Sequence, residues 1–78
     1  MYYVYLLKLS NNDHYVGFSE NLQTRIKDHH EGKCSTTAKF RPVELVWYCG
    51  FKDKYKALKF ESYLKKGTGH AFRNKHLE

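Results

Sequence analysis

The sequence predicts an α+β domain in which helices cover an antiparallel sheet, in the order β-β-α-β-α-α. Two observations lead to this prediction. Three short runs rich in aromatic and β-branched residues are typical of strands, at 2–7, 14–18 and 43–51. The other long stretches carry apolar residues at helical spacing and are bounded by capping residues. Because a short turn joins the first two strands, we expect a hairpin, which makes the sheet antiparallel.

The hairpin turns at Ser10-Asn11-Asn12-Asp13, residue types that favour tight turns. Tyr5 and Tyr15 are ten positions apart. A turn with an odd number of residues puts both phenols on one face of the sheet, whereas a two-residue turn separates them. Tyrosines in strands are usually packing residues with a hydrated hydroxyl, so this pair alone does not identify a catalytic site.

The first helix is predicted to begin at the cap residue Ser19, with Glu20 near its positive end, and to run to about Glu31 before Gly32. Within it, Arg25 and His29 are four residues apart and therefore share a helix face.

On a helical wheel, the Arg25 and His29 column lies beside the column of Leu22 and Ile26, which should face the core. At that edge, a guanidinium can bind a phosphate through its rigid fork of N–H groups. The simpler alternatives are a surface salt bridge for Arg25 and a capping role for His29.

A polar, basic loop is predicted at 33–42, followed by the third strand at Val43–Phe51, with Trp47 in or near the core. The loop contains three candidate contacts for a nucleic-acid backbone: Lys33, Lys39 and Arg41. A run of charge is more often simply solvated, so these three residues are candidates only.

The second helix is predicted to begin at Asp53 and to end at Gly67. Glu61 lies about 40° from Ala57 and about 60° from Leu64 on the helical wheel, so its carboxylate points with the apolar stripe. A buried carboxylate is costly unless it is paired or bound to a metal. Two explanations therefore stay open: an ion pair with Arg25 or a lysine, and a hard divalent cation such as Mg²⁺.

Thr68 can cap a short last helix at 69–76, which carries Asn74 as a further candidate for contacting substrate. Leu77-Glu78 resembles a cloning remnant, and we assign it no function. The 78 residues are expected to form a single domain.

The formal net charge is +6, from 14 Lys and Arg against 8 Asp and Glu, which favours a polyanionic partner such as nucleic acid. Solubility is the competing explanation of that charge. We see neither a signal peptide nor an apolar run of about 20 residues, so we expect a cytoplasmic protein. Cys34 and Cys49 do not form a disulfide framework, and their spacing matches no standard zinc site.

Taken in order, these residues resemble the GIY-YIG nucleases, in particular their small single-domain branch. The motifs that carry the resemblance are Tyr3-Val4-Tyr5, Tyr15-Val16-Gly17, the Arg25 to His29 element, Glu61 within 57–65, and the segment 67–72. Each motif is short, but the ordered set covers nearly the whole chain. The chain departs from the family at Tyr3, where the first motif has glycine.

The resemblance implies a three-stranded antiparallel sheet with flanking helices, and cleavage of phosphodiesters that depends on Mg²⁺ or Mn²⁺. It puts the metal on Glu61. We therefore predict an endonuclease acting on nucleic acid, with DNA the expected substrate, as a monomer or weak homodimer. Arg25 would stabilise the phosphoryl oxygens and Tyr15 would position water or phosphate, while Tyr5 or His29 would take the proton.

The alternative is a module of the same fold that binds nucleic acid but cleaves it slowly or not at all. Such a module would bind without needing divalent metal, and its affinity would fall steeply with salt. A third possibility is a homodimeric interaction protein that uses its exposed aromatic side chains.

Overall fold

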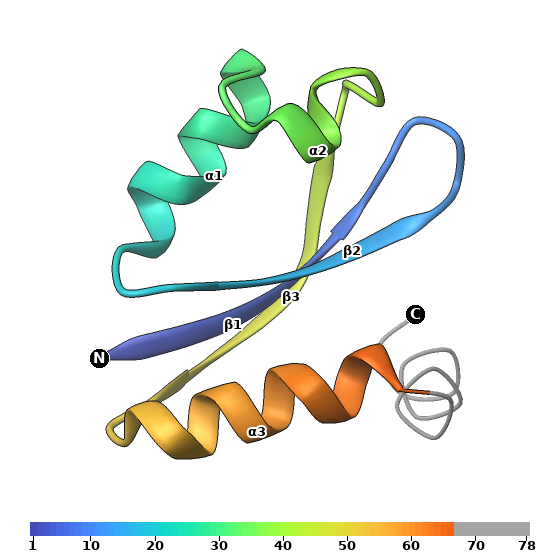
Figure 1. The fold of residues 1–78 in the computed structure, drawn as a ribbon. Helices are drawn as coiled ribbons and strands as arrows, with labels where there is room; N and C mark the ends of the chain where they lie inside the picture. The colour runs from blue at the N-terminus through green and yellow to red at the C-terminus, as the bar shows by residue number, and fades with distance from the viewer. Residues whose placement is uncertain (67–78) are drawn as a thin grey trace.

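The computed structural model describes residues 1–66 as a three-stranded sheet with helices on both faces (Figure 1). The strands are β1 (Tyr2–Lys8), β2 (His14–Ser19) and β3 (Glu44–Phe51). The helices are α1 (Leu22–Glu31), α2 (Ser35–Ala38) and α3 (Lys54–Lys65). The strand order is β2-β1-β3 and both pairings are antiparallel, which confirms the predicted fold class. The last predicted helix, with Asn74, lies outside the described residues.

The connection between β1 and β2 has an odd number of residues, which is the condition for Tyr5 and Tyr15 to share a face of the sheet. Lys8 pairs with His14, so residues 9–13 form the turn, and Tyr5 and Tyr15 lie on the same face of the sheet. Asn12 adopts a left-handed conformation with φ 70°, which asparagine tolerates better than most residues. Side-chain alternation then places Tyr5 opposite Gly17 on β2.

Strand β1 is the central strand and divides the core in two. Val4 and Leu6 pack on one face with Ala57 and Leu64 of α3. Side chains of the other face, among them Tyr5, pack with α1 (Figure 1). The helices α1 and α3 therefore cover opposite faces of the sheet.

Trp47 of β3 packs against the core cluster on the α3 side, as predicted, with its ring 5.6 Å from that of Phe60. A bulge in the β1–β3 ladder lies between Leu6 and Leu7, whose partners are Trp47 and Leu45. The extra residue in β3 shifts the alternation of that strand by one position.

Helix α1 begins two residues later than predicted, because Asn21 is its cap rather than Ser19. The side chain of Asn21 accepts a hydrogen bond from the Thr24 N–H at 3.1 Å. Ser19 still belongs to β2, where its hydroxyl accepts from the Asn21 N–H and donates to the Asn21 carbonyl. The helix ends at Gly32, as predicted, with a left-handed φ of 79°.

The segment predicted as a polar loop contains the one-turn helix α2, Ser35–Ala38. Its buried residue is Thr37, which is fully shielded from solvent. The prediction missed this turn because a single helical turn has no apolar periodicity of its own.

Helix α3 is capped by Asp53, whose carboxylate accepts from the Tyr55 N–H at 2.8 Å. Ala57 and Leu64 are its buried residues, which confirms the predicted stripe. It ends at Lys65, close to the predicted end at Gly67. No helix in residues 1–66 is both long enough and apolar enough to cross a membrane.

Candidate active site

The site is organised around Tyr5, whose ring lies over the backbone of β2 at Gly17. A Cβ atom built on Gly17 would be 2.6 Å from Cε2 of Tyr5, and still closer to the end of the ring. Any larger residue would therefore displace the phenol. Because β2 is an edge strand, the Tyr5 hydroxyl reaches toward the border of the sheet.

A chain of two buried hydrogen bonds runs from Tyr5 into the protein. Tyr5 Oη is 2.9 Å from His29 Nε2, and His29 Nδ1 is 2.7 Å from Thr37 Oγ1. Tyr5 and His29 are each 1% exposed. The helical wheel predicted His29 at the edge of the buried stripe, and the structure corrects this prediction, because His29 is fully buried. It is buried because α2 folds against α1 and supplies Thr37 as a partner.

Tyr15 forms the outer wall of the same cluster. Its ring lies edge-on to that of His29, with centroids 5.4 Å apart, and is tilted against that of Tyr5 at 6.4 Å. Tyr15 is half-buried, whereas the other two rings are buried. A small molecule or a phosphate approaching the Tyr5 hydroxyl would therefore meet Tyr15 first.

The environment keeps both Tyr5 and His29 neutral near pH 7. Burial raises the pKa of Tyr5 well above its ordinary value; Tyr15 adds to the increase, and Arg25 opposes it. Burial also lowers the pKa of His29, and the Arg25 charge lowers it further. Desolvation therefore outweighs the attraction to Arg25, and the pKa of Tyr5 is raised rather than lowered. Tyr5 retains its proton in the free protein.

Because the pKa of His29 is lowered on folding, we expect the protein to lose stability as the pH falls below about 6.5. In that range the unfolded chain binds a proton at this position and the folded protein does not. The loss is at most about 1.4 kcal/mol for each pH unit, until the pKa of His29 in the folded state is reached. Urea unfolding between about pH 7.5 and about pH 5 measures it.

His30 provides the matched control, because it is exposed and adjacent to His29. The variant His30→Asn should retain the pH dependence of the wild type, whereas His29→Asn should have a flatter one. Equal slopes for His29→Asn and the wild type would contradict the assignment.

Arg25 lies on α1 one turn before His29, with its side chain exposed. Its charge lowers the pKa of Tyr5 and that of His29, so the guanidinium is close enough to act on both. An exposed guanidinium beside a buried phenol is well placed to bind an anion at the mouth of the cluster.

Glu61 approaches from the other side of the sheet. It lies on α3, which covers the face opposite the tyrosines, and its side chain is 18% exposed. Glu61 and the two tyrosines therefore lie on opposite faces of the sheet. Its carboxylate nevertheless raises the pKa of Tyr5, so the two groups interact electrostatically. Its ion-pair partner in residues 1–66 is Lys65 at 3.3 Å, not Arg25.

The Glu61 carboxylate suits a hard divalent cation. No cluster of three or more His, Cys, Asp or Glu side chains that could hold a metal ion occurs within residues 1–66, and the free cysteines Cys34 and Cys49 are part of none. A single carboxylate matches a hard cation that keeps most of its waters, as Mg²⁺ does. The residues present therefore fit Mg²⁺ or Mn²⁺ better than a fully protein-bound metal.

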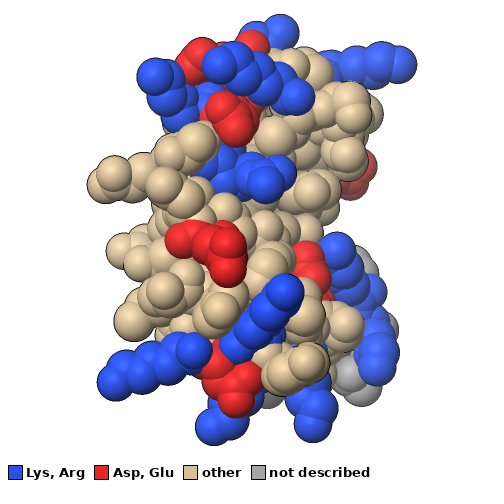
Figure 2. Space-filling view, turned by 60° about the vertical axis from the view of Figure 1, so that its left-hand side comes forward, with Lys and Arg blue, Asp and Glu red and all other residues tan. Residues whose placement is uncertain are grey.

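The basic candidates of the segment between α1 and β3 are all exposed. Lys33 pairs with Glu31 at 3.6 Å. Arg41 donates from Nε to the Ala38 carbonyl at 3.0 Å, and its guanidinium lies against Gly32. Figure 2 shows Lys and Arg side chains gathered at the two ends of one face, with uncharged residues and some acidic side chains between them. Asn74 lies outside the described residues.

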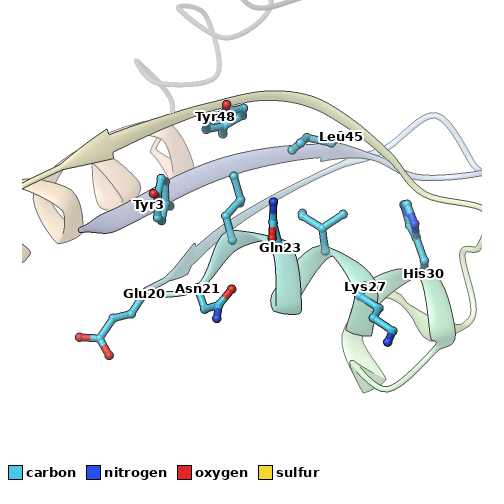
Figure 3. Close-up of a pocket in the computed structure, with 10 residues that line it drawn as sticks. Tyr3, Glu20, Asn21, Gln23, Lys27, His30, Leu45 and Tyr48 are labelled. Carbon is cyan, nitrogen blue, oxygen red and sulfur yellow. The ribbon is translucent and has the colours of Figure 1, made fainter.

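A hollow of about 740 Å³ lies between α1 and the sheet (Figure 3). Its lining includes Tyr3 and Tyr48 from the sheet and Lys27 and His30 from α1. No catalytic candidate lines it. On the wheel, Lys27 and His30 point away from the Arg25 and His29 column, so this hollow lies on the opposite flank of α1 from the candidate site.

Comparison with known proteins identifies the family of the chain. A family model described as "GIY-YIG catalytic domain" matches residues 1–75. The chain belongs to the GIY-YIG family. This GIY-YIG chain is 37% identical over 68 residues to the UPF0213 protein YazA of Bacillus subtilis (strain 168), covering 86% of this chain and 69% of that protein. It is 41% identical over 69 residues to the UPF0213 protein CPE1444 of Clostridium perfringens (strain 13 / Type A), covering 87% and 74%.

Among solved structures, the solution NMR structure of the UPF0213 protein BH0048 from Bacillus halodurans matches with a TM-score of 0.62 and 27% identity. The match covers 99% of this chain and 87% of that one. Membership of the GIY-YIG family places the chain among nuclease domains.

One residue of the GIY-YIG site was missed from the sequence. Thr37 touches His29, but it lies in a segment that we had interpreted only through its lysines and arginine. The available signal was local: Ser35-Thr36-Thr37-Ala38 is a run of small, uncharged residues within an otherwise basic stretch. Such a run can pack closely against another element.

Proposed function

We propose that this GIY-YIG domain is a metal-dependent endonuclease that hydrolyses phosphodiester bonds in DNA. The observation that carries the proposal is the Tyr5–His29 hydrogen bond, with a guanidinium and a carboxylate both acting on the same phenol. These are a proton acceptor, an anion-binding group and a metal ligand. Metal-assisted hydrolysis of a phosphodiester uses groups of these three kinds.

Arg25 binds the scissile phosphate and stabilises the charge that grows on its non-bridging oxygens. Glu61 would hold the divalent ion through its carboxylate. A bound Mg²⁺ or Mn²⁺ supplies Lewis acidity at the phosphate and at the leaving oxygen. Tyr15, which is the exposed member of the ring cluster, positions the attacking water or the phosphate.

The proton leaves the water by way of two protein groups. The water gives its proton to Tyr5 Oη while the phenol gives its own proton to His29 Nε2, and the hydroxide attacks phosphorus. Tyr5 stays neutral throughout, which its raised pKa favours, and His29 becomes the imidazolium. His29 is thus the final acceptor and Tyr5 is the relay, because the phenol keeps its own proton and its hydroxyl is hydrogen-bonded to His29 Nε2 at 2.9 Å.

The basic side chains of the segment before β3, together with Asn74, contact the backbone of the bound nucleic acid. Three of them, Lys33, Lys39 and Arg41, are exposed. They supply affinity that depends on salt and does not read sequence. We propose that the active form is a monomer or a weak homodimer.

The proposal is tested with labelled DNA and RNA, single- and double-stranded, and with supercoiled plasmid, each in Mg²⁺, Mn²⁺ or EDTA. We expect cleavage of DNA with either metal and none in EDTA. A parallel preparation of Arg25→Ala detects any contaminating nuclease. Binding without cleavage, unaffected by EDTA and weakened by salt, would instead identify a binding module.

A further inference from the structure

Thr37 is a polar side chain with no exposure to solvent, held in place by the one-turn helix α2. Its hydroxyl lies 2.7 Å from His29 Nδ1, which makes this the shorter of the two hydrogen bonds to the ring. A buried hydroxyl aimed at an imidazole nitrogen can act on that ring in a way that an apolar residue of the same shape cannot.

The two ring nitrogens of a neutral histidine have different roles, since one carries a proton and donates while the other accepts. In one tautomer Nδ1–H donates to Thr37 and Nε2 accepts from Tyr5. In the other, Nε2–H donates to Tyr5 and the Thr37 hydroxyl donates to Nδ1. Only the first leaves Nε2 able to receive a proton from Tyr5.

The burial of Tyr5 favours the first arrangement. Its phenol keeps its proton and is 1% exposed, and its hydroxyl is hydrogen-bonded to His29 Nε2 at 2.9 Å. A buried hydroxyl that keeps its proton donates it where an acceptor is available. If Nε2 accepts, the single ring proton is on Nδ1 and its partner is Thr37.

We propose that Thr37 is a positioning residue, which accepts a hydrogen bond from His29 Nδ1–H and thereby holds the imidazole with an unprotonated Nε2 facing Tyr5. Its contribution to catalysis rests on the proposed function, whereas the tautomer itself does not. The arrangement assigns α2 a role: it carries the hydroxyl that prepares the proton acceptor.

Valine has nearly the shape of threonine but cannot accept a hydrogen bond. The variant Thr37→Val would leave Nδ1–H buried without a partner, which is costlier than leaving an acceptor without one. We therefore expect the ring proton to move to Nε2 in this variant, and cleavage to fall by about 10- to 100-fold. Thr37→Ser keeps the hydroxyl and should restore both properties.

Nitrogen-15 NMR of the histidine rings reads the tautomer directly in the full chain. The matched control is Thr36→Val, the same substitution at the adjacent exposed threonine. The inference is supported if His29 carries its proton on Nδ1 in the wild type and in Thr36→Val, and on Nε2 in Thr37→Val. An Nε2–H tautomer in the wild type overturns it, as does an unchanged tautomer in Thr37→Val.

If Thr37→Val does not fold, the wild-type spectrum and that of Thr37→Ser decide the question, because both retain the hydroxyl and must show Nδ1–H. The spectra also separate the two proposals. A wild type that shows Nδ1–H but cleaves no nucleic acid would refute the nuclease proposal and leave the tautomer assignment standing.

Discussion

Replacing Tyr5 with phenylalanine should slow cleavage by about 10²- to 10⁴-fold, the range by which a positioned proton-transfer group accelerates a reaction. The substitution removes one oxygen atom and keeps the ring that packs over Gly17. The variant lacks the hydroxyl through which the proton of the attacking water would pass to His29 Nε2. The measurement is the initial rate of nicking of a supercoiled plasmid at saturating Mg²⁺.

The lost hydroxyl also leaves His29 Nε2 without its partner, so we expect Tyr5→Phe to lower the free energy of unfolding by about 1–3 kcal/mol. Tyr3→Phe is the matched control, because Tyr3 lies on the same strand and the same face but outside the hydrogen-bonded cluster. It should retain wild-type rates. Full activity in a folded Tyr5→Phe protein would remove Tyr5 from the proton path.

Replacing Glu61 with glutamine should reduce metal-dependent cleavage by about 10³-fold or more, because the amide keeps the size of the side chain but removes the charge that holds the cation. Because the variant binds the cation more weakly, raising the Mg²⁺ concentration should recover part of the rate. The assay is a Mg²⁺ titration of plasmid nicking for the variant and the wild type.

Stability should change little in Glu61→Gln. Its partner Lys65 is 55% exposed, and a surface pair of this kind contributes at most about 1 kcal/mol. Glu31→Gln is the matched control, because it breaks the corresponding surface pair with Lys33 at 3.6 Å. That variant should cleave normally. If Glu61→Gln nicks plasmid as fast as the wild type in Mg²⁺, Glu61 is not the metal ligand.

The distribution of charge around Tyr5 explains why substitutions of Tyr5 and Glu61 are expected to have the largest effects on cleavage. Arg25 and Glu61 have opposite effects on the pKa of the phenol, while burial sets its overall direction. A cation bound at Glu61 would change the local electrostatics at the moment when substrate and water arrive. The free site is therefore neutral at Tyr5 and His29, with its charges on Arg25 and Glu61, the groups proposed to bind phosphate and metal.

Much of the fold follows from local pattern. The turn residues and the parity of the Tyr5–Tyr15 spacing predicted the hairpin and its common face, because alternation along a strand has a period of two. The wheel placed Glu61 with Ala57 and Leu64, because helical periodicity is equally regular. The cap of α1 was misplaced by two residues, since Ser19 and Asn21 are both good caps and only strand pairing decides between them.

The sequence by itself determined the α+β class, the strands and long helices, and which side of each element turns inward. It also supplied the ordered motifs that place the chain in the GIY-YIG family. These properties depend on neighbouring residues and on fixed backbone periods, so a linear pattern contains them.

Only the tertiary structure decided which residues the buried face of each helix and strand contacts. It placed Glu61 on the opposite side of the sheet from Tyr5, and it buried His29 under α2 with Thr37 as its partner. It also decided the direction in which the pKa of Tyr5 shifts, because desolvation depends on the whole surrounding volume and not on sequence neighbours. Burial thus favours a neutral Tyr5 phenol in the free protein, for a physical reason that no local pattern carries.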